Sequence, residues 1–255
     1  MTFISSQDYF VNIQRSQVPN TTLIHKFGRN DSVPNGTWAF VNQLGFTAWP
    51  LSAVTTVRVK AGGNAADASG GAGAREVIVQ GIDESLNEVQ EAITMNADGT
   101  LASSATTITF FRVHRAWVSQ VGTYDVANTG NIVIENSAGG TDLIQITAGE
   151  GQSQFGGYTI PTGFTGYMTQ LFLTADANKA TDFRLFVRNQ FNDTSAPMNG
   201  RRIKLYFDGV VGALDYRPPG PGLVIDHESD VWVEAKGPVG GAEVSCMFEL
   251  MLEAN

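Results

Sequence analysis

The chain has 255 residues, a formal net charge of -9 and only 16% charged residues. This length accommodates one large β domain or two of ordinary size, and we expect two. Because few residues are charged, Thr, Ser, Asn and Gln must supply much of the polar surface, which suits sheets better than helices. The acidic balance argues against binding to nucleic acid, whose phosphates attract clustered Lys and Arg.

The N-terminal sequence lacks the basic start and continuous apolar core of a signal peptide. No run approaches the roughly 18 apolar residues of a membrane helix. We therefore expect a protein that is made in the cytoplasm and binds no membrane. A single cysteine, Cys246, excludes an internal disulfide, and its apolar surroundings at 244–252 indicate a buried, inert thiol.

Residues 1–35 carry isolated apolar residues among Asn, Gln and Ser, without a sustained period. We interpret them as an N-terminal arm, with a short helix near 7–14. Ordering such a segment costs about 1–2 kcal/mol of backbone entropy per residue, so a neighbouring subunit must supply the compensating contacts. The residues predicted to make these assembly contacts are Phe3, Ile4, Tyr9, Phe10, Val11 and Ile13.

Strand patterns begin after the arm and recur through the first half of the chain. The tract 61–74 contains only Ala, Gly, Asn, Asp and Ser and is predicted to be a loop. The run 106–118 is apolar on both faces, so we expect a central strand. The predicted strands are 37–41, 53–60, 75–80, 88–95, 106–118 and a hairpin of 131–135 with 143–147.

In the second half, the strand patterns at 158–160 and 167–173 are joined by a turn at Pro161, Gly163 and Gly166. Further patterns occupy 182–189, 202–207, 230–235 and 243–252. Strands at this spacing, with no amphipathic helix between them, indicate sandwich or jelly-roll topology. We predict an all-β fold in which an N-terminal arm (1–35) precedes two β-sandwich or jelly-roll-like domains, 36–140 and 141–255.

No motif predicts a catalytic site, a cofactor or a metal centre. The tract Gly70–Ala74 lacks the Lys-Ser/Thr pair of a phosphate loop and precedes a strand. The carboxylates of Asp226, Glu228 and Asp230 could bind a hard cation, but a solvated hairpin is favoured. Carboxylate pairs that could serve glycoside hydrolysis are Asp83 with Glu84 and Glu88 with Glu91; their setting in a turn favours a role in solubility.

The histidines and tryptophans leave alternatives open. His25, His114 and His227 are far apart, without ligand partners at short spacing. Of these, His114 lies between two arginines on a predicted strand, where it belongs to a polar sheet face or contacts an acidic partner. The tryptophans are expected to anchor the core, with sugar stacking as the alternative; they are Trp38, Trp49, Trp117 and Trp232.

Six segments follow one another in a distinctive order. They are KFGRN at 26–30, ADASGGAGAREVIVQGID at 66–83, NEVQE at 87–91, FRVHRAWV at 111–118, GQSQFGGYTIPTGFTGY at 151–167 and SDVWVEAKG at 229–237. Their order resembles that of virion structural proteins of tailed, largely marine, bacteriophages, over about residues 24–255. The tract Ala61–Asn64 departs from the pattern, because a Ser-rich tract is expected there.

The resemblance implies a non-enzymatic structural component of a tailed-phage virion, either a capsid decoration (cement) protein or a neck or tail subunit. It transfers no catalytic residues and no cofactor. The implied partners are capsid, neck or tail subunits and further copies of the chain, and the implied location is the virion. The alternative is a carbohydrate-binding or receptor-binding β-sandwich module of the tail, and a third possibility is a glycan-degrading tail enzyme.

Overall fold

The computed structural model describes residues 9–15, 17–46, 49–220 and 222–255. Within these ranges the chain is all-β apart from one short helix, α1 (Tyr9–Gln14), which confirms the predicted fold class. No helix in the described ranges is long and apolar enough to span a bilayer.

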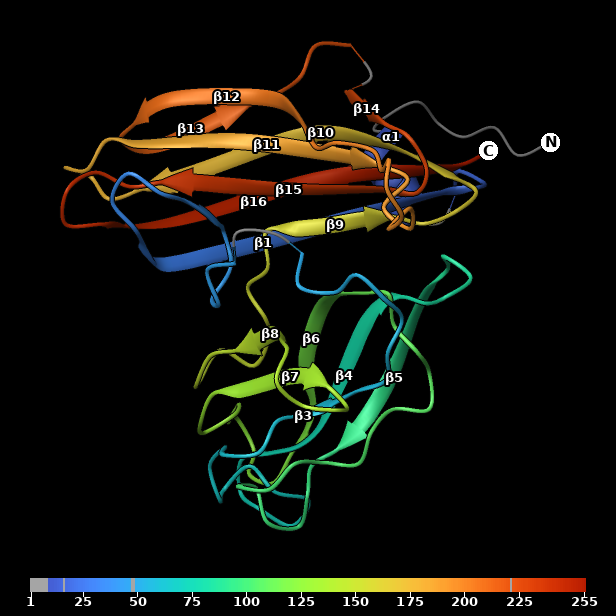
Figure 1. The fold of residues 1–255 in the computed structure, drawn as a ribbon, viewed down its shortest axis with the longest axis vertical. Helices are drawn as coiled ribbons and strands as arrows, with labels where there is room; N and C mark the ends of the chain where they lie inside the picture. The colour runs from blue at the N-terminus through green and yellow to red at the C-terminus, as the bar shows by residue number, and fades with distance from the viewer. Residues whose placement is uncertain (1–8, 16, 47–48, 221) are drawn as a thin grey trace.

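Two stacked antiparallel sheets form a β-sandwich in the upper part of Figure 1. One sheet has the order β1-β16-β10-β13, with β14 also paired to β10; the strands are β1 (Thr21–Val33), β16 (Ala242–Ala254), β10 (Phe164–Ala175), β13 (Gly212–Tyr216) and β14 (Leu223–Ile225). The other has the order β12-β11-β15-β2, with β9 also paired to β15; the strands are β12 (Arg202–Val210), β11 (Thr181–Asn189), β15 (Ser229–Lys236), β2 (Trp38–Phe40) and β9 (Gly157–Ile160).

The sandwich core follows from alternation in the strands of both sheets. In β11 the buried Phe183, Leu185 and Val187 belong to the core, and in β16 Cys246 and Phe248 do. Burial raises the pKa of the Cys246 thiol to about 12. This confirms the predicted buried thiol and keeps it protonated, and therefore unreactive, at neutral pH.

A second unit is inserted between β2 and β9 and occupies the lower part of Figure 1. It contains two three-stranded sheets, one with the order β3-β7-β8 and one with the order β5-β4-β6. Their strands are β3 (Val57–Val59), β7 (Ile132–Asn136), β8 (Asp142–Ile146), β5 (Glu88–Thr94), β4 (Ala74–Ile82) and β6 (Arg112–Val121). Its core also takes in Phe186 and Trp232 from the sandwich, so apolar packing continues from one unit into the other.

The structure therefore divides the chain differently from the predicted domains 36–140 and 141–255. A boundary near 140 would cut the hairpin of β7 and β8, in which Ile134 lies opposite Ile144. That hairpin was itself predicted from its turn. The domain assignment failed because β1 pairs with β16 from the opposite end of the chain, and local periodicity carries no signal for that pairing.

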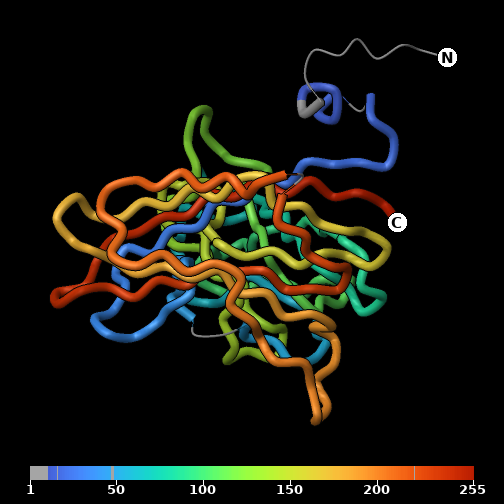
Figure 2. Tube along the Cα trace, turned by 90° about the horizontal axis from the view of Figure 1, so that it is seen from above, coloured from blue at the N-terminus to red at the C-terminus, as the bar shows by residue number. Residues whose placement is uncertain are grey.

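The predicted arm is also corrected, because residues 21–33 form a sheet strand rather than a loose segment. β1 pairs along most of β16, and its buried positions include Lys26, Gly28 and Asn30. A strand whose inward face carries Lys, Gly and Asn shows no apolar period. The helix α1 precedes it and contacts β1; Figure 2 shows α1 standing apart from the stacked strands.

Two further expectations concern single segments. The turn at Pro161–Gly163 is present, but it carries the chain from one sheet to the other, since β9 pairs with β15 and β10 with β16. The run 106–118 is not a central strand, because β6 lies at the edge of its sheet. Its second face is nevertheless covered, since β6 contacts β9 of the sandwich.

Gly28 marks the closest approach of β1 to the connections between the two units. A Cβ at this position would lie 2.3 Å from the backbone nitrogen of Gly156 and 2.5 Å from the carbonyl oxygen of Val41. Both neighbours are backbone atoms, which side-chain rotation cannot move aside. Only glycine therefore fits here without displacing a strand.

We expect Gly28→Ala to lower the free energy of unfolding by on the order of 1–3 kcal/mol, because the backbones must separate. Gly70→Ala is the matched control, since a Cβ at Gly70 meets nothing within 4 Å. Urea denaturation of both variants measures the difference. Equal midpoints would show that the close approach at Gly28 does not exist in solution.

Candidate functional site

The junction between the two units contains a buried ion pair. Arg112 on β6 is 2% exposed and Asp230 on β15 is 0% exposed. Arg112 Nε donates to Asp230 Oδ1 over 3.1 Å, and Nη2 donates to Oδ2 over 3.0 Å. Thr159 Oγ1 donates to the same carboxylate over 2.7 Å, while Arg112 Nη1 donates to the carbonyl oxygen of Leu51 over 2.9 Å. This two-pronged geometry fixes both distance and orientation between the units.

Aromatic rings surround the guanidinium group of Arg112. Its central carbon lies 4.7 Å from the ring centre of Phe111, 5.0 Å from that of Phe191 and 5.4 Å from that of Trp49. A planar cation against aromatic faces is attracted by their quadrupoles and is more weakly hydrated than an ammonium group. The site thus combines an ion pair with a cage of aromatic rings.

A second polar cluster lies two residues further along β6, around the buried His114. His114 Nε2 lies 3.1 Å from Glu88 Oε1 on β5, and the hydroxyl of Tyr158 on β9 donates to the same oxygen over 3.1 Å. The ammonium group of Lys26 on β1 donates to the backbone carbonyl of His114. Four strands from both units therefore meet at this cluster.

Burial dominates the protonation states in the His114 cluster. It lowers the pKa of His114 to about 4, and it holds the pKa of Lys26 well below its ordinary value. It also raises the pKa of Tyr158. For Glu88, burial is the largest single influence and acts to raise the pKa, but the hydrogen bonds from His114 and Tyr158 and the neighbouring charges together outweigh it, and the pKa is lowered. A neutral histidine that donates to a carboxylate is the arrangement consistent with these shifts.

A cavity of about 420 Å³ lies beside this cluster, between β1 and the inserted unit. Lys26, Arg115 and Glu88 bring two basic side chains and one acidic side chain to its wall, and Gln80, Gln152 and Ser153 add neutral polar groups. Arg115 donates to the backbone carbonyl of His25, so the outer side of β1 is held by the inserted unit.

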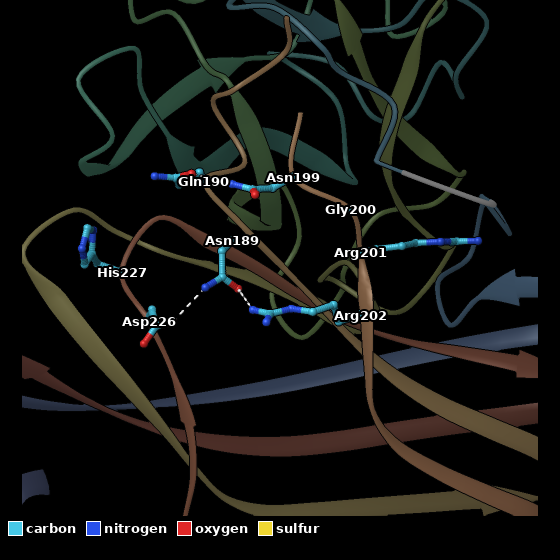
Figure 3. Close-up of a pocket in the computed structure, with 8 residues that line it drawn as sticks. All are labelled: Asn189, Gln190, Asn199, Gly200, Arg201, Arg202, Asp226 and His227. Carbon is cyan, nitrogen blue, oxygen red and sulfur yellow. Dashed lines mark hydrogen bonds between the residues drawn. The ribbon is translucent and has the colours of Figure 1, made fainter. Parts of the chain in front are cut away.

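Two more cavities, of about 600 Å³ each, adjoin each other beside the segment that joins β11 to β12. Figure 3 shows the first, where Asn189 bridges Arg202 and Asp226 through hydrogen bonds of 3.0 and 2.8 Å. The second is more apolar and contains Trp49 and Trp232 in its wall. Asn199, Gly200 and Arg201 are common to both cavities.

Strand β12 provides an exposed surface of a different kind. It ends its sheet, and β11 is its pairing partner among the described strands. Ile203 and Tyr206 are each 50% exposed on it, and Arg202, Lys204 and Asp208 are exposed between and beside them. A nine-residue edge strand with unpaired backbone groups is a template for pairing with another strand.

The predicted assembly residues of the N-terminal segment are only partly covered by the structure. Phe3 and Ile4 lie outside the described residues. Tyr9 and Phe10 begin α1, and Val11 is partly buried within it. Ile13 is 3% exposed in the single chain, so its own chain already buries this side chain, contrary to the prediction that a second subunit does.

The four carboxylates considered for glycoside hydrolysis have different hydrogen-bond partners. Asp83 accepts backbone N–H groups of its own turn, and Glu91 accepts those of Thr107 and Ile108, while Glu88 belongs to the His114 cluster. Glu84 lies in the turn after β4 and is exposed.

The carboxylates at 226–230 also have separate surroundings. Asp226 bonds Asn189, Glu228 accepts from Thr162, and Asp230 is buried against Arg112. The expected solvated hairpin is therefore wrong for Asp230. Within the described ranges, no group of three or more His, Cys, Asp or Glu residues is arranged to hold a metal ion.

The tryptophans are largely inside the protein. Trp232 is buried, while Trp38, Trp49 and Trp117 are partly buried. The predicted core role is confirmed for Trp232. Its ring stacks on Phe186 at 5.3 Å and lies 6.2 Å from Phe40, in an aromatic cluster that spans both units.

We expect Arg112→Met to lower the free energy of unfolding by about 3–5 kcal/mol, because it leaves the carboxylate of Asp230 buried and unpaired. Combining it with Asp230→Leu should cost less than the sum of the two single substitutions, since no unpaired charge then remains. Arg217→Met, which removes an exposed pair with Asp215, is the control. Additive losses in denaturant titrations would show that the two residues are not coupled.

We expect stability to fall as the pH decreases from about 6.5 to 4. In this interval the unfolded chain protonates His114 while the folded chain does not, which removes on the order of 2–3 kcal/mol. The lowered pKa of Glu88 removes further stability below its ordinary value of 4.5. Thermal unfolding across this range measures the slope. His114→Gln should flatten it, and substitution of the exposed His227 by Gln should not; an unchanged slope in His114→Gln would contradict this assignment.

Comparison with known proteins adds little to this geometry. No protein-family profile and no curated protein matches the chain. Among solved structures, that of infectious bursal disease virus, Gx strain, is 13% identical, with 97% of this chain and 78% of that chain covered and a TM-score of 0.27. The VP2 subviral particle of infectious bursal disease virus is 10% identical, with coverage of 92% and 81% and a TM-score of 0.13. TM-scores this low do not establish a common fold.

Proposed function

We propose that the protein is a non-enzymatic structural component of a tailed-phage virion that acts by symmetric protein–protein assembly. Its place in the virion would be as a capsid decoration (cement) protein or as a neck or tail subunit. The observation that carries the proposal is the ordered set of segments at 26–30, 66–83, 87–91, 111–118, 151–167 and 229–237, which resembles such proteins.

The location of these segments in the fold supports a structural role. The first contains Lys26 and Gly28, the fourth contains Arg112 and His114, and the last contains Asp230. These residues build the junction between the sandwich and the inserted unit. The segments that carry the resemblance are thus the ones that hold the two units in one orientation, which a building block of a particle requires.

The polar groups in the junction are mostly engaged with one another. Asp230 accepts from Arg112 and Thr159, and Glu88 accepts from Tyr158 and faces His114. A general base must instead reach a substrate proton at hydrogen-bond distance. The junction therefore favours rigidity over turnover, and β12 offers a surface through which a rigid unit can contact others.

A glycan-binding module of the tail is the second candidate, and the two adjoining cavities beside 189–202 favour it. One cavity presents Asn189, Gln190 and Arg202, whose amide and guanidinium groups suit sugar hydroxyls, and the other presents Trp49. Aromatic faces and planar polar groups together form the usual wall of a ligand pocket.

The test is the protein content of purified virions from the phage that encodes this sequence. We expect mass spectrometry to detect the chain at a fixed ratio to the major capsid or tail proteins, and immunogold electron microscopy to place it on the particle. Its absence from virions in which other structural proteins are detected would overturn the proposal. Binding on a glycan array, accompanied by quenching of Trp49 fluorescence and lost on Arg202→Ala, would favour the second candidate.

A further inference from the structure

Two basic side chains at the junction make no ion pair. Lys26 on β1 is 3% exposed, and its ammonium group donates to the backbone carbonyl of His114. Arg115 on β6 donates to the backbone carbonyl of His25. Among the residues that the structure describes, neither side chain forms a salt bridge, although the chain has 25 acidic residues against 16 basic ones. A buried lysine is rare unless it is paired, so this pair of side chains calls for an explanation.

Lys26 is also the group at this place whose protonation can change near neutral pH. Burial lowers its pKa well below the ordinary value, the charge of Arg115 lowers it further, and Glu88 and Cys246 act in the opposite direction. The other titratable groups nearby keep one protonation state at neutral pH: His114 is neutral, Cys246 and Tyr158 stay protonated, and Glu88 stays ionised. An additional negative charge beside Lys26 would therefore favour its protonated form.

Both basic side chains line the cavity of about 420 Å³ between β1 and the inserted unit. Figure 1 shows β1 along the side of the sandwich that faces this unit. Small-molecule sites occupy about 300–1,000 Å³, whereas a water molecule takes up only about 30 Å³. The cavity therefore has room for a small ligand beside Lys26 and Arg115.

The neutral groups of the cavity wall add hydrogen-bond donors. Ser153 is 8% exposed, and its Oγ accepts from the backbone N–H of Ala116 over 2.9 Å, which leaves the hydroxyl proton to donate. The side-chain amides of Gln80 and Gln152 make no hydrogen bond with the described residues and can turn their NH₂ groups toward a ligand.

Glu88 is the carboxylate on this wall, and it is already engaged. Its Oε1 accepts from the hydroxyl of Tyr158 over 3.1 Å and lies 3.1 Å from His114 Nε2. Donors on the wall thus outnumber the free acceptors. A ligand that only accepts hydrogen bonds and carries negative charge matches this wall, and oxyanions have both properties.

We propose that this cavity binds a tetrahedral oxyanion, a phosphate or sulfate group, between the ammonium group of Lys26 and the guanidinium group of Arg115. The anion would join β1 of the sandwich to β6 of the inserted unit through charge-assisted hydrogen bonds. This site goes beyond the proposed function and does not rest on it.

Calorimetric titration of the full chain with inorganic phosphate tests the site. We expect saturable binding and a rise in the midpoint of thermal unfolding, because a ligand that binds the folded chain stabilises it. Sodium chloride at the same ionic strength is the control, since it screens exposed charges equally and should not reproduce the rise. A parallel titration with glycerol phosphate distinguishes the source of the group: binding of both shows that the cavity accepts a phosphate ester, and binding of inorganic phosphate alone identifies the free ion.

A pair of arginine substitutions separates the site from general charge effects. Arg115→Gln should weaken phosphate binding by about tenfold or more, because one of the two cationic groups is removed. Arg75→Gln is the matched control. Arg75 also donates to a backbone carbonyl, that of Gly71 over 2.8 Å, and it is not part of the cavity wall, so this variant should bind phosphate like the unmodified chain.

Proton uptake reports on Lys26 directly. Sulfate does not titrate near neutral pH, so its binding enthalpy in buffers of different ionisation enthalpy measures the protons that the protein takes up. We expect uptake by the unmodified chain, since the bound anion favours the protonated form of Lys26, and neither uptake nor binding by Lys26→Met.

Three results would each overturn the inference: no saturable binding of inorganic phosphate, a stabilisation that sodium chloride reproduces, or equal phosphate affinities for Arg115→Gln and Arg75→Gln. The arginine pair decides the question even where Lys26→Met fails to fold. None of these results bears on whether the protein belongs to a virion, which its detection in purified particles decides separately.

Discussion

The orientation of the two units depends on a charge that has been taken out of water. The guanidinium group of Arg112 contacts a carboxylate from β15 and backbone carbonyls at Leu51 and Phe111, within a cage of three aromatic rings. A buried guanidinium group is stable only while its hydrogen-bond partners stay in place. A small rotation between the units would separate Arg112 from these partners and leave its charge unpaired, which costs several kcal/mol in order of magnitude. Arg112 and His114 lie two residues apart on β6, and both are buried. Both clusters thus join the inserted unit to strands of the sandwich from one strand, β6.

This arrangement makes the inserted unit a fixed part of the sandwich rather than a tethered neighbour. Aromatic packing through Phe40, Phe155 and Trp232 joins the two cores, and Gly28 lets β1 approach the connecting segments. Interfaces between domains often permit relative motion, but a mixed apolar and ionic junction of this kind opposes it. A stiff unit loses little entropy when it assembles, which favours ordered contacts through its free edges.

Local patterning predicted the strands well and their partners poorly. Alternation located β11, β12 and β16, and turn chemistry located the β7–β8 hairpin, because both signals reside in neighbouring residues. β1 was missed as a strand because its inward residues Lys26, Gly28 and Asn30 are stabilised by tertiary contacts. Asp230 looked like part of a solvated hairpin, since its partner Arg112 is 118 residues away in the sequence. One available signal was Arg112 itself, a charged residue within the apolar run Phe110–Val113, where burial requires a counter-charge from elsewhere.

The interleaved order of the two units has a consequence for synthesis on the ribosome. All strands of the inserted unit have been made once residue 155 has emerged, whereas the sandwich must wait for β16, which pairs with both β1 and β10. Throughout that interval β1 has no partner strand. A strongly apolar strand that stays unpaired during synthesis exposes apolar surface, which promotes association between nascent chains. Lys26, Gly28 and Asn30, the residues that hide β1 from sequence patterning, also make this strand less apolar than a usual core strand during that interval.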